Sequence, residues 1–254
     1  MSTGSVKSET SSLNVYSKER NVVIKKIENV IISDAIKTNG PNIMDGLTFL
    51  DGIFSNSISV CFFDPQYRGI MDKMKYGNEG VSRQIERSQL SQMSEEVISE
   101  FIQEIGRVLI PSGHLFLWVD KFHLCQGVSS WLKDTDLSIV DLITWDKGKI
   151  GMGYRTRRKT EYLVVIQKLP IKAKGIWTKH NIPDVWTEKI VGKIHPHQKP
   201  LELQKALIEA VTNEGEYVID PCAGSYNVME ACKQNNRIFI GTNVRNPYQE
   251  NGTN

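Results

Sequence analysis

Two patterns of apolar residues alternate along the chain: short continuous runs, and positions repeated at helical spacing. Ile58–Phe63 is a short and nearly continuous apolar run, typical of a strand buried on both faces of a sheet. Residues 94–109 differ, because Ser94 and two glutamates precede apolar side chains that recur at helical spacing. The two periodicities predict a buried strand and an amphipathic helix, with Pro111-Ser-Gly113 ending the helix.

The rest of the chain continues this alternation. We expect further strands at residues 22–24, 29–33, 115–119, 137–145, 161–166, 217–220 and 237–241. We expect further helices at residues 122–132, 201–211 and 227–233, and a strand end running into a short helix at 45–50. Strands that alternate with helices favour an open α/β sheet with helices on both faces.

The two ends differ in composition from the middle. Residues 1–20 are rich in Ser and Thr and cannot bury enough apolar surface to offset the entropy of ordering, so we expect a disordered tail. Residues 246–254 are polar and form a second tail. One domain over residues 21–245 is therefore expected.

Composition excludes several classes of protein. Of the 254 residues, 40% are hydrophobic and 24% charged, as in ordinary globular domains. No apolar run approaches the roughly 18 residues of a membrane span, and the N-terminus lacks a signal-peptide core, so a cytoplasmic protein without membrane contact is expected. The four cysteines lack metal-ligand spacing, which predicts no metal site. A net charge of +2 neither demands nor excludes a nucleic-acid partner.

Polar segments follow two of the predicted strands. Asp64-Pro-Gln-Tyr67 comes directly after Ile58–Phe63. Asp220-Pro-Cys-Ala-Gly-Ser-Tyr226 lies between a strand and a helix, and its small residues allow a ligand to approach the backbone closely. Open α/β sheets place their sites at the carboxyl ends of strands. Both segments are thus candidates for one site.

These two segments, with His195-Pro-His-Gln-Lys-Pro200 between them, resemble the DNA amino-methyltransferases in their β-class motif order. That family has a catalytic (D/N/S)-P-P-(Y/F/W) motif, then a recognition insertion, an H-x-x-Q-K-P segment and a D-P-F-x-G-S-G cofactor loop. The resemblance covers about residues 30–245. Gln66, Tyr226 and Asn243 depart from the family pattern, replacing a proline, a glycine and a common acid.

The resemblance implies a Rossmann-like S-adenosylmethionine-dependent methyltransferase fold. Its sheet would be mixed but mostly parallel, with a circularly permuted motif order. It also divides the domain into a catalytic half at about 45–166, a recognition insertion at about 167–194 and a cofactor-binding half at about 195–245.

The resemblance further assigns roles to residues. The catalytic residues it implies are Asp64, Pro65 and Tyr67. The residues it implies for S-adenosylmethionine are Asp45, Lys199, Asp220, Ala223, Gly224, Ser225 and Asn243, with Lys199 as the partner of the cofactor carboxylate. With this interpretation, the basic residues of the irregular stretch 68–93 and of the segment 155–159 become phosphate contacts: Arg68, Lys73, Lys75, Arg83, Arg155, Arg157, Arg158 and Lys159.

The implied function is methylation of an exocyclic amino group on a flipped base of double-stranded DNA. An Asp-led motif favours adenine N6, with cytosine N4 as the alternative. An RNA or protein-amide methyltransferase and a catalytically silent DNA-binding subunit are the other hypotheses. A cognate restriction endonuclease and a second copy of the chain are partners that the sequence leaves open.

Overall fold

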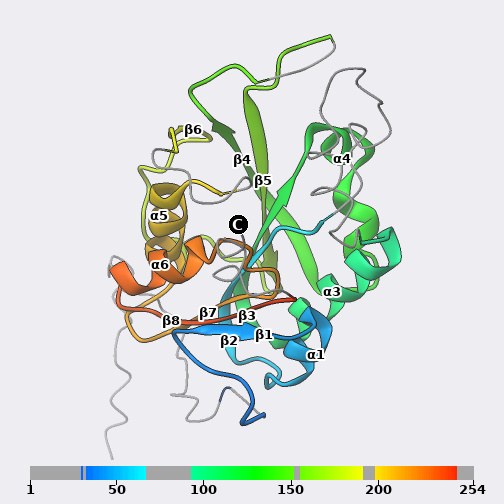
Figure 1. Ribbon diagram of the computed structural model, residues 1–254, viewed down its shortest axis with the longest axis vertical. Helices are drawn as coiled ribbons and strands as arrows, with labels where there is room; N and C mark the ends of the chain where they lie inside the picture. The colour runs from blue at the N-terminus through cyan, green and yellow to red at the C-terminus, as the bar shows by residue number, and fades with distance from the viewer. Residues whose placement is uncertain (1–29, 31–32, 67–92, 152–154, 191–197, 245–254) are drawn as a thin grey trace, which may run out of the picture.

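The core of the protein is one mixed β-sheet (Figure 1). The computed structural model describes residues 30, 33–66, 93–151, 155–190 and 198–244. In this part of the chain, eight strands lie in the order β1-β8-β7-β2-β3-β5-β4-β6. Their bounds are β1 Pro41–Ile43, β2 Ile58–Phe63, β3 Leu109–Val119, β4 Leu137–Asp146, β5 Thr160–Lys168, β6 Val185–Thr187, β7 Tyr217–Asp220 and β8 Ile238–Asn243.

Strand direction decides which loops meet. Strands β1, β8, β7, β2 and β3 are parallel to their neighbours in this order. Strand β5 is antiparallel to both β3 and β4, and β6 is parallel to β4. Strand β4 therefore runs in the same direction as β3, and the loop that joins β4 to β5 projects from the edge at which β1, β8, β7, β2 and β3 end.

Helices cover both faces of the sheet, as the alternating pattern predicts (Figure 1). One apolar core lies between the sheet and the helices α1 Gly46–Asp51 and α3 Glu95–Val108, with α4 Lys121–Gln126 and the 3-10 helix η2 Val128–Leu132 nearby. The second core lies between the opposite face and the helices α5 Leu201–Val211 and α6 Asn227–Gln234. Phe62, Phe116 and Leu163 of the sheet face this second core, while Phe63 and Leu117 face the first.

Strands β1 and β6 were not predicted from the sequence, and two further elements differ in their bounds. Strand β3 begins at Leu109 rather than Leu115, because Leu109 already pairs with Ile58 of β2, and Pro111-Ser-Gly113 lie in the irregularity of register before His114 pairs with Val60. The helix predicted at 122–132 is divided at Gly127, whose φ of 93° ends α4 before η2 begins. The strand predicted at 22–24, most of that at 29–33 and both predicted tails lie outside the described residues.

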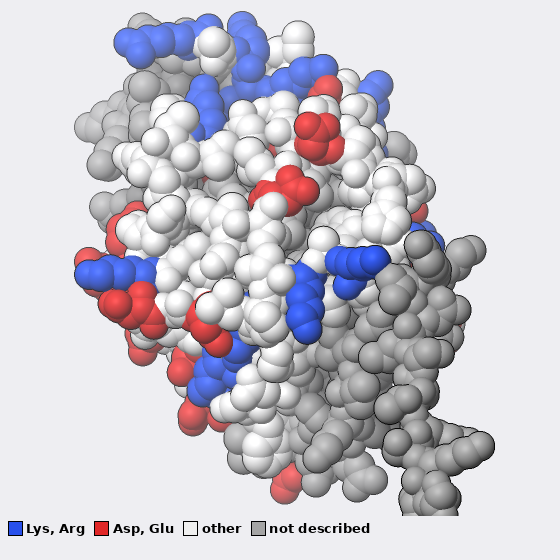
Figure 2. All heavy atoms as spheres, turned by 180° about the vertical axis from the view of Figure 1, so that it is seen from behind, with Lys and Arg blue, Asp and Glu red and all other residues white. Residues whose placement is uncertain are grey.

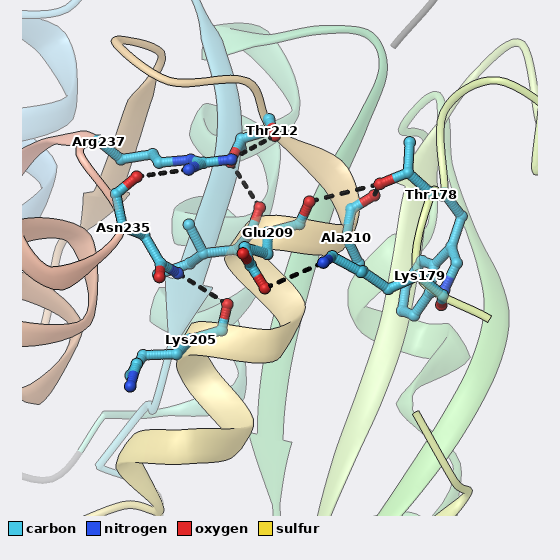
Figure 3. A network of polar contacts seen from close by, with 10 residues as sticks. Thr178, Lys179, Lys205, Glu209, Ala210, Thr212, Asn235 and Arg237 are labelled. Atoms are coloured by element: carbon cyan, nitrogen blue, oxygen red, sulfur yellow. Dashed lines mark hydrogen bonds and ion pairs between the residues drawn. The ribbon is translucent and has the colours of Figure 1, made fainter. Parts of the chain in front are cut away.

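The segment that follows β5 is fixed to the C-terminal end of α5 (Figure 3). Thr178 donates from its backbone N–H and its hydroxyl to the carbonyl of Ala210, at 2.8 and 3.1 Å. Arg237 donates from Nη2 to the carbonyl of Thr212 at 2.7 Å. These bonds satisfy carbonyls that the end of a helix leaves without intrahelical partners. Part of the predicted recognition insertion is thus packed against the domain.

No helix in the described ranges is both long and apolar enough to cross a membrane. The expected cytoplasmic location remains a prediction.

Candidate active site

Four predicted site residues lie at one edge of the sheet. Asn243 ends β8, Asp220 ends β7, Asp64 directly follows β2, and Asp45 lies two residues after β1. Because these four strands are parallel and adjacent, their carboxyl ends meet at the same edge. The fold therefore brings together Asp45 and Asp64 from the N-terminal part of the sequence and Asp220 and Asn243 from the C-terminal part.

The loop after β7 is anchored by hydrogen bonds to its own strand and to β8. Asp220 accepts a hydrogen bond from the backbone N–H of Cys222 at 3.0 Å, and Ala223 N–H donates to the carbonyl of Thr242 at 2.9 Å. Gly224 has a φ of 46°, and among the described residues a Cβ placed there would find only one atom within 4 Å, the carbonyl oxygen of Cys222 at 3.9 Å. The loop is thus anchored beside an open, uncrowded glycine, where a ligand can approach the backbone.

Asp45 lies beside this loop because it begins helix α1. Its carboxylate caps the helix by accepting from the N–H groups of Leu47 and Thr48, at 3.0 and 3.1 Å. A Cβ on the next residue, Gly46, would lie 2.8 Å from the carbonyl oxygen of Pro221. Only glycine allows this close approach between the start of α1 and the loop after β7.

Asp64 forms an ion pair that places it in a chain of charges. Its Oδ2 lies 3.0 Å from Nζ of Lys199, and Lys199 lies at the same distance from Oε2 of Glu161. Glu161 in turn pairs with the ammonium of Lys147. The Lys199 ammonium also lies 4.8 Å from the ring centroid of Trp118. The side chain of Lys199 is only 15% exposed, so these interactions are shielded from solvent.

The charges shift one another's pKa values. Burial alone would lower the pKa of Lys199, but the carboxylates of Asp64 and Glu161 outweigh it and raise that pKa above its ordinary value. Burial likewise works to raise the pKa of Glu161, but Lys199 and Lys147 lower it to about 2. Lys199 is therefore a cation and Glu161 an anion throughout the neutral range.

Asp220 behaves differently from the other carboxylates. Burial raises its pKa to about 8, and the neighbouring charge of Asp64 adds to the rise, although the Cys222 N–H and Lys199 oppose it. Asp220 is 6% exposed and is therefore largely neutral at pH 7, when it holds the loop by hydrogen bonding rather than by charge.

The predicted DNA contacts fall into two groups. Arg155, Arg157, Arg158 and Lys159 lie in the loop between β4 and β5, and all but Arg158 are exposed. Figure 2 shows Lys and Arg side chains gathered at the end of the molecule that carries this hairpin. Arg68, Lys73, Lys75 and Arg83 lie outside the described residues, as does Tyr67.

Sequence reasoning missed Glu161, Trp118 and Lys147. The only signal was a charged residue at the start of an apolar strand, Glu161 before the buried run 163–166. Reasoning from the resemblance also gave Lys199 to the cofactor carboxylate, whereas the structure places its ammonium between Asp64 and Glu161. Among the described residues, no group of three or more His, Cys, Asp or Glu could hold a metal ion.

Solved structures show which class of fold this is. The structure titled "PvuII DNA methyltransferase (cytosine-N4-specific)" matches with a TM-score of 0.64 and 14% identity, over 87% of this chain and 89% of that one. The structure titled "crystal structure of M1.HpyAVI-SAM complex" matches with a TM-score of 0.58 and 18% identity, over 81% and 92% of the two chains. The fold is that of the DNA methyltransferases, as predicted.

Sequence comparison defines the family. Residues 58–253 match the family model of the N6/N4 methyltransferases, described as DNA methylase. The type II methyltransferase M.HhaII of Haemophilus parahaemolyticus is 58% identical over 207 residues, which cover 81% of this chain and 91% of that protein. The type II methyltransferase M2.DpnII of Streptococcus pneumoniae is 27% identical over 80% of this chain and 84% of that protein. This chain belongs to the DNA methylase family, and the predicted class of enzyme and its methyl donor, S-adenosylmethionine, are confirmed.

Proposed function

We propose that this methylase acts on the N6 amino group of adenine in double-stranded DNA, with Asp64 and the carbonyl of Pro65 as its catalytic groups. The observation that carries the proposal is the position of Asp64, one residue beyond β2 and at the same sheet edge as the open Gly224 loop. A base held at Asp64 would face a cofactor held on the neighbouring strands.

The exocyclic amino nitrogen is a poor nucleophile because its lone pair is delocalised into the ring. Hydrogen bonds from the amino group to Asp64 and to the Pro65 carbonyl favour a tetrahedral nitrogen and localise that lone pair. Both acceptors follow a buried strand, so they are held in place before the substrate arrives. In-line attack on the sulfonium methyl then needs only positioning, without a covalent enzyme intermediate. As the N–CH3 bond forms, the S–CH3 bond breaks and leaves a neutral thioether; the proton that the methylated nitrogen then loses passes to the carboxylate of Asp64 or to water.

The cofactor supplies an electrophilic methyl group when bound. The residues that fit it are those of the loop after β7, Ala223, Gly224 and Ser225, with Asp220 holding the loop, Asn243 at the end of β8 and Asp45 at the start of α1. The open space at Gly224 and the close approach of Gly46 to Pro221 support this assignment. The assignment of Lys199 to the cofactor carboxylate stays a prediction beside its observed contacts with Asp64 and Glu161.

The target base must leave the duplex before Asp64 can reach it. We assign its stacking to Tyr67, because an aromatic ring contributes about 1–3 kcal/mol per stacked base. The exposed basic loop between β4 and β5 projects from the same sheet edge as Asp64, which supports phosphate contacts by Arg155, Arg157, Arg158 and Lys159.

Adenine is favoured over cytosine by the Asp-led motif. A relative named DNA adenine methyltransferase YhdJ, of Escherichia coli, is 40% identical over 58 residues, or 23% of this chain. A cognate restriction endonuclease is a further proposal, in line with the type II names of the relatives. Sedimentation tests whether two copies of the chain form a dimer.

Long-read methylation profiling tests the proposal. DNA from cells that express this chain is compared with DNA from cells that express Asp64→Ala. One sequence motif modified at adenine N6, and unmodified in the variant, is expected. Modification at cytosine N4 would replace the adenine assignment, and modification of RNA alone would overturn the DNA substrate. Equal modification by the variant would remove Asp64 from its role.

A further inference from the structure

Three residues near the carboxyl edge of the sheet, Asp64, Trp118 and Glu161, surround the ammonium of Lys199. Side chains alternate between the faces of a sheet, so Glu161 lies on the same face as Leu163 and Val165, which pack against α5. Trp118 lies on that face with Phe116, and Asp64 follows Phe62 with the same alternation. Strand β3, with Trp118, lies between β2 and β5, and Glu161 is two residues from Leu163, the residue that pairs with Trp118.

Lys199 fills the space over this tryptophan. Neighbouring strands are about 4.8 Å apart, so the backbones of β2 and β5 are about twice that distance from each other. The two carboxylates cannot bond to each other directly when ionised, because neither carries a proton to donate. The Lys199 ammonium spans the gap, 3.0 Å from an oxygen of each carboxylate and 4.8 Å from the Trp118 ring centroid. The ring, 2% exposed, keeps water from one side of the two ion pairs.

The backbone of Lys199 is fixed independently of its ammonium. Its carbonyl accepts from Nδ2 of Asn227, the first residue of α6, at 2.7 Å. Helix α5 begins two residues later, and the carboxylate of Glu188 accepts from the N–H groups of Glu202 and Leu203 in its first turn, each at 3.1 Å. The ammonium can therefore respond to its charged partners without movement of the main chain.

The signs of the charges alternate along the chain of contacts: Asp64, Lys199, Glu161, Lys147. Lys147 begins the β4–β5 loop, and its backbone N–H donates to the carbonyl of Lys159 at 3.0 Å. If Glu161 were neutral, the charge of Lys199 would be balanced by Asp64 alone, and Asp64 would be a weaker acceptor for an amino group. Shared between two carboxylates, Lys199 holds Asp64 in place while leaving it available to the base.

We propose that Glu161 is a positioning residue for methyl transfer, which shares Lys199 with Asp64 and is itself held by Lys147 of the β4–β5 loop. This inference rests on the proposed function, because it assigns Glu161 a role through Asp64. Glu161 acts on turnover and not on binding of cofactor or DNA.

Four variants test it: Glu161→Gln, Glu161→Asp, Lys147→Met, and the double variant that combines Glu161→Gln with Lys147→Met. Glu161→Gln keeps the shape of the side chain and removes its charge. We expect kcat on duplex DNA to fall about 10-fold, the effect of losing one charge-assisted hydrogen bond, with KM for DNA and Kd for S-adenosylmethionine within about twofold. Glu161→Asp keeps the charge and should restore part of the loss. Lys147→Met should lower kcat alone but add nothing to Glu161→Gln, because it acts through that residue.

Glu202→Gln is the matched control. Glu202 lies three residues from Lys199 and forms its ion pair with Lys205, at 3.0 Å. The kcat of Glu202→Gln should therefore stay close to that of the unmodified enzyme. Unchanged kcat in Glu161→Gln, or additive losses in the double variant, would overturn the role of Glu161. Thermal melting shows whether Glu161→Gln is folded. If it is not folded, an unchanged kcat in Lys147→Met would overturn the role of Glu161 instead. Failure of the proposed function is distinct, because the unmodified enzyme itself would then not methylate the duplex.

Discussion

The hydroxyl of Tyr226 donates a hydrogen bond to the backbone carbonyl of Asn42 at 2.9 Å, which joins the end of the loop after β7 to β1. Tyr226 has a left-handed φ of 55°, where the family pattern has a glycine, and its side chain is 2% exposed against Phe239. The ring thus enters the core and leaves the space beside Gly224 open. The departure from the family pattern is compatible with a cofactor site.

Tyr226→Phe tests this account. Removing the hydroxyl should lower the free energy of unfolding by about 1 kcal/mol, the usual net value of one hydrogen bond, and leave the affinity for S-adenosylmethionine unchanged. Urea denaturation and calorimetry measure the two quantities. Tyr217→Phe is the control, since the Tyr217 hydroxyl makes no hydrogen bond to the described residues. A large loss of cofactor affinity would show that Tyr226 contacts the ligand.

Gly224→Trp should abolish binding of S-adenosylmethionine, because the new ring would occupy the open space over the loop. Gly215→Trp is a matched control: Gly215 has a φ of 78° and no atom of the described residues within 4 Å of its Cβ position, so a side chain there is also strained by a positive φ, in a different loop. Titration calorimetry should show no binding in the first variant and normal affinity in the second. Normal affinity in Gly224→Trp would remove the loop from the cofactor site.

Asp220 should make stability depend on pH. Its pKa of about 8 in the folded protein exceeds the ordinary value, so between about pH 4 and pH 8 the folded state binds more protons than the unfolded state. The contribution of Asp220 to the free energy of unfolding therefore falls as pH rises through this window, by up to about 1.4 kcal/mol per pH unit.

Asp220→Asn keeps the oxygen that accepts from Cys222 and removes the charge. Relative to the unmodified protein, the variant should gain stability from about pH 4 to pH 8 in urea denaturation, a range in which Glu161 stays ionised. A constant difference between the two proteins over this range would contradict the raised pKa.

Replacing Arg155, Arg157 and Arg158 by Gln should weaken binding of duplex DNA without changing cofactor affinity. The slope of log K against log salt should become shallower by roughly 0.9 for each phosphate that the variant no longer neutralises. Lys172→Gln with Lys174→Gln is the control, because these exposed lysines follow β5 at the opposite edge of the sheet. Equal salt slopes in both variants would exclude the β4–β5 loop from the DNA surface.

The sequence by itself determined the elements and the class of chemistry. Apolar periodicity gave β2, α3, α5 and β7 to within a residue or two, because a side chain's burial depends mainly on its own position in a strand or helix. The motifs around Asp64 and Asp220 gave the family, because small residues and a carboxylate after a buried strand are local features. The Asp-led motif favours adenine over cytosine, but the choice itself depends on the shape of the pocket that holds the base, which no local motif specifies.

Only the tertiary structure decided the partners of these residues. The start of β3 at Leu109 depends on its pairing with β2, and the division of the helix predicted at 122–132 depends on the backbone angle of Gly127. Lys199 reaches Asp64 and Glu161 because three strands from distant parts of the sequence are neighbours in the sheet. Ion pairs act over a few ångströms in space, and their strength depends on burial, so no local pattern in the sequence records them.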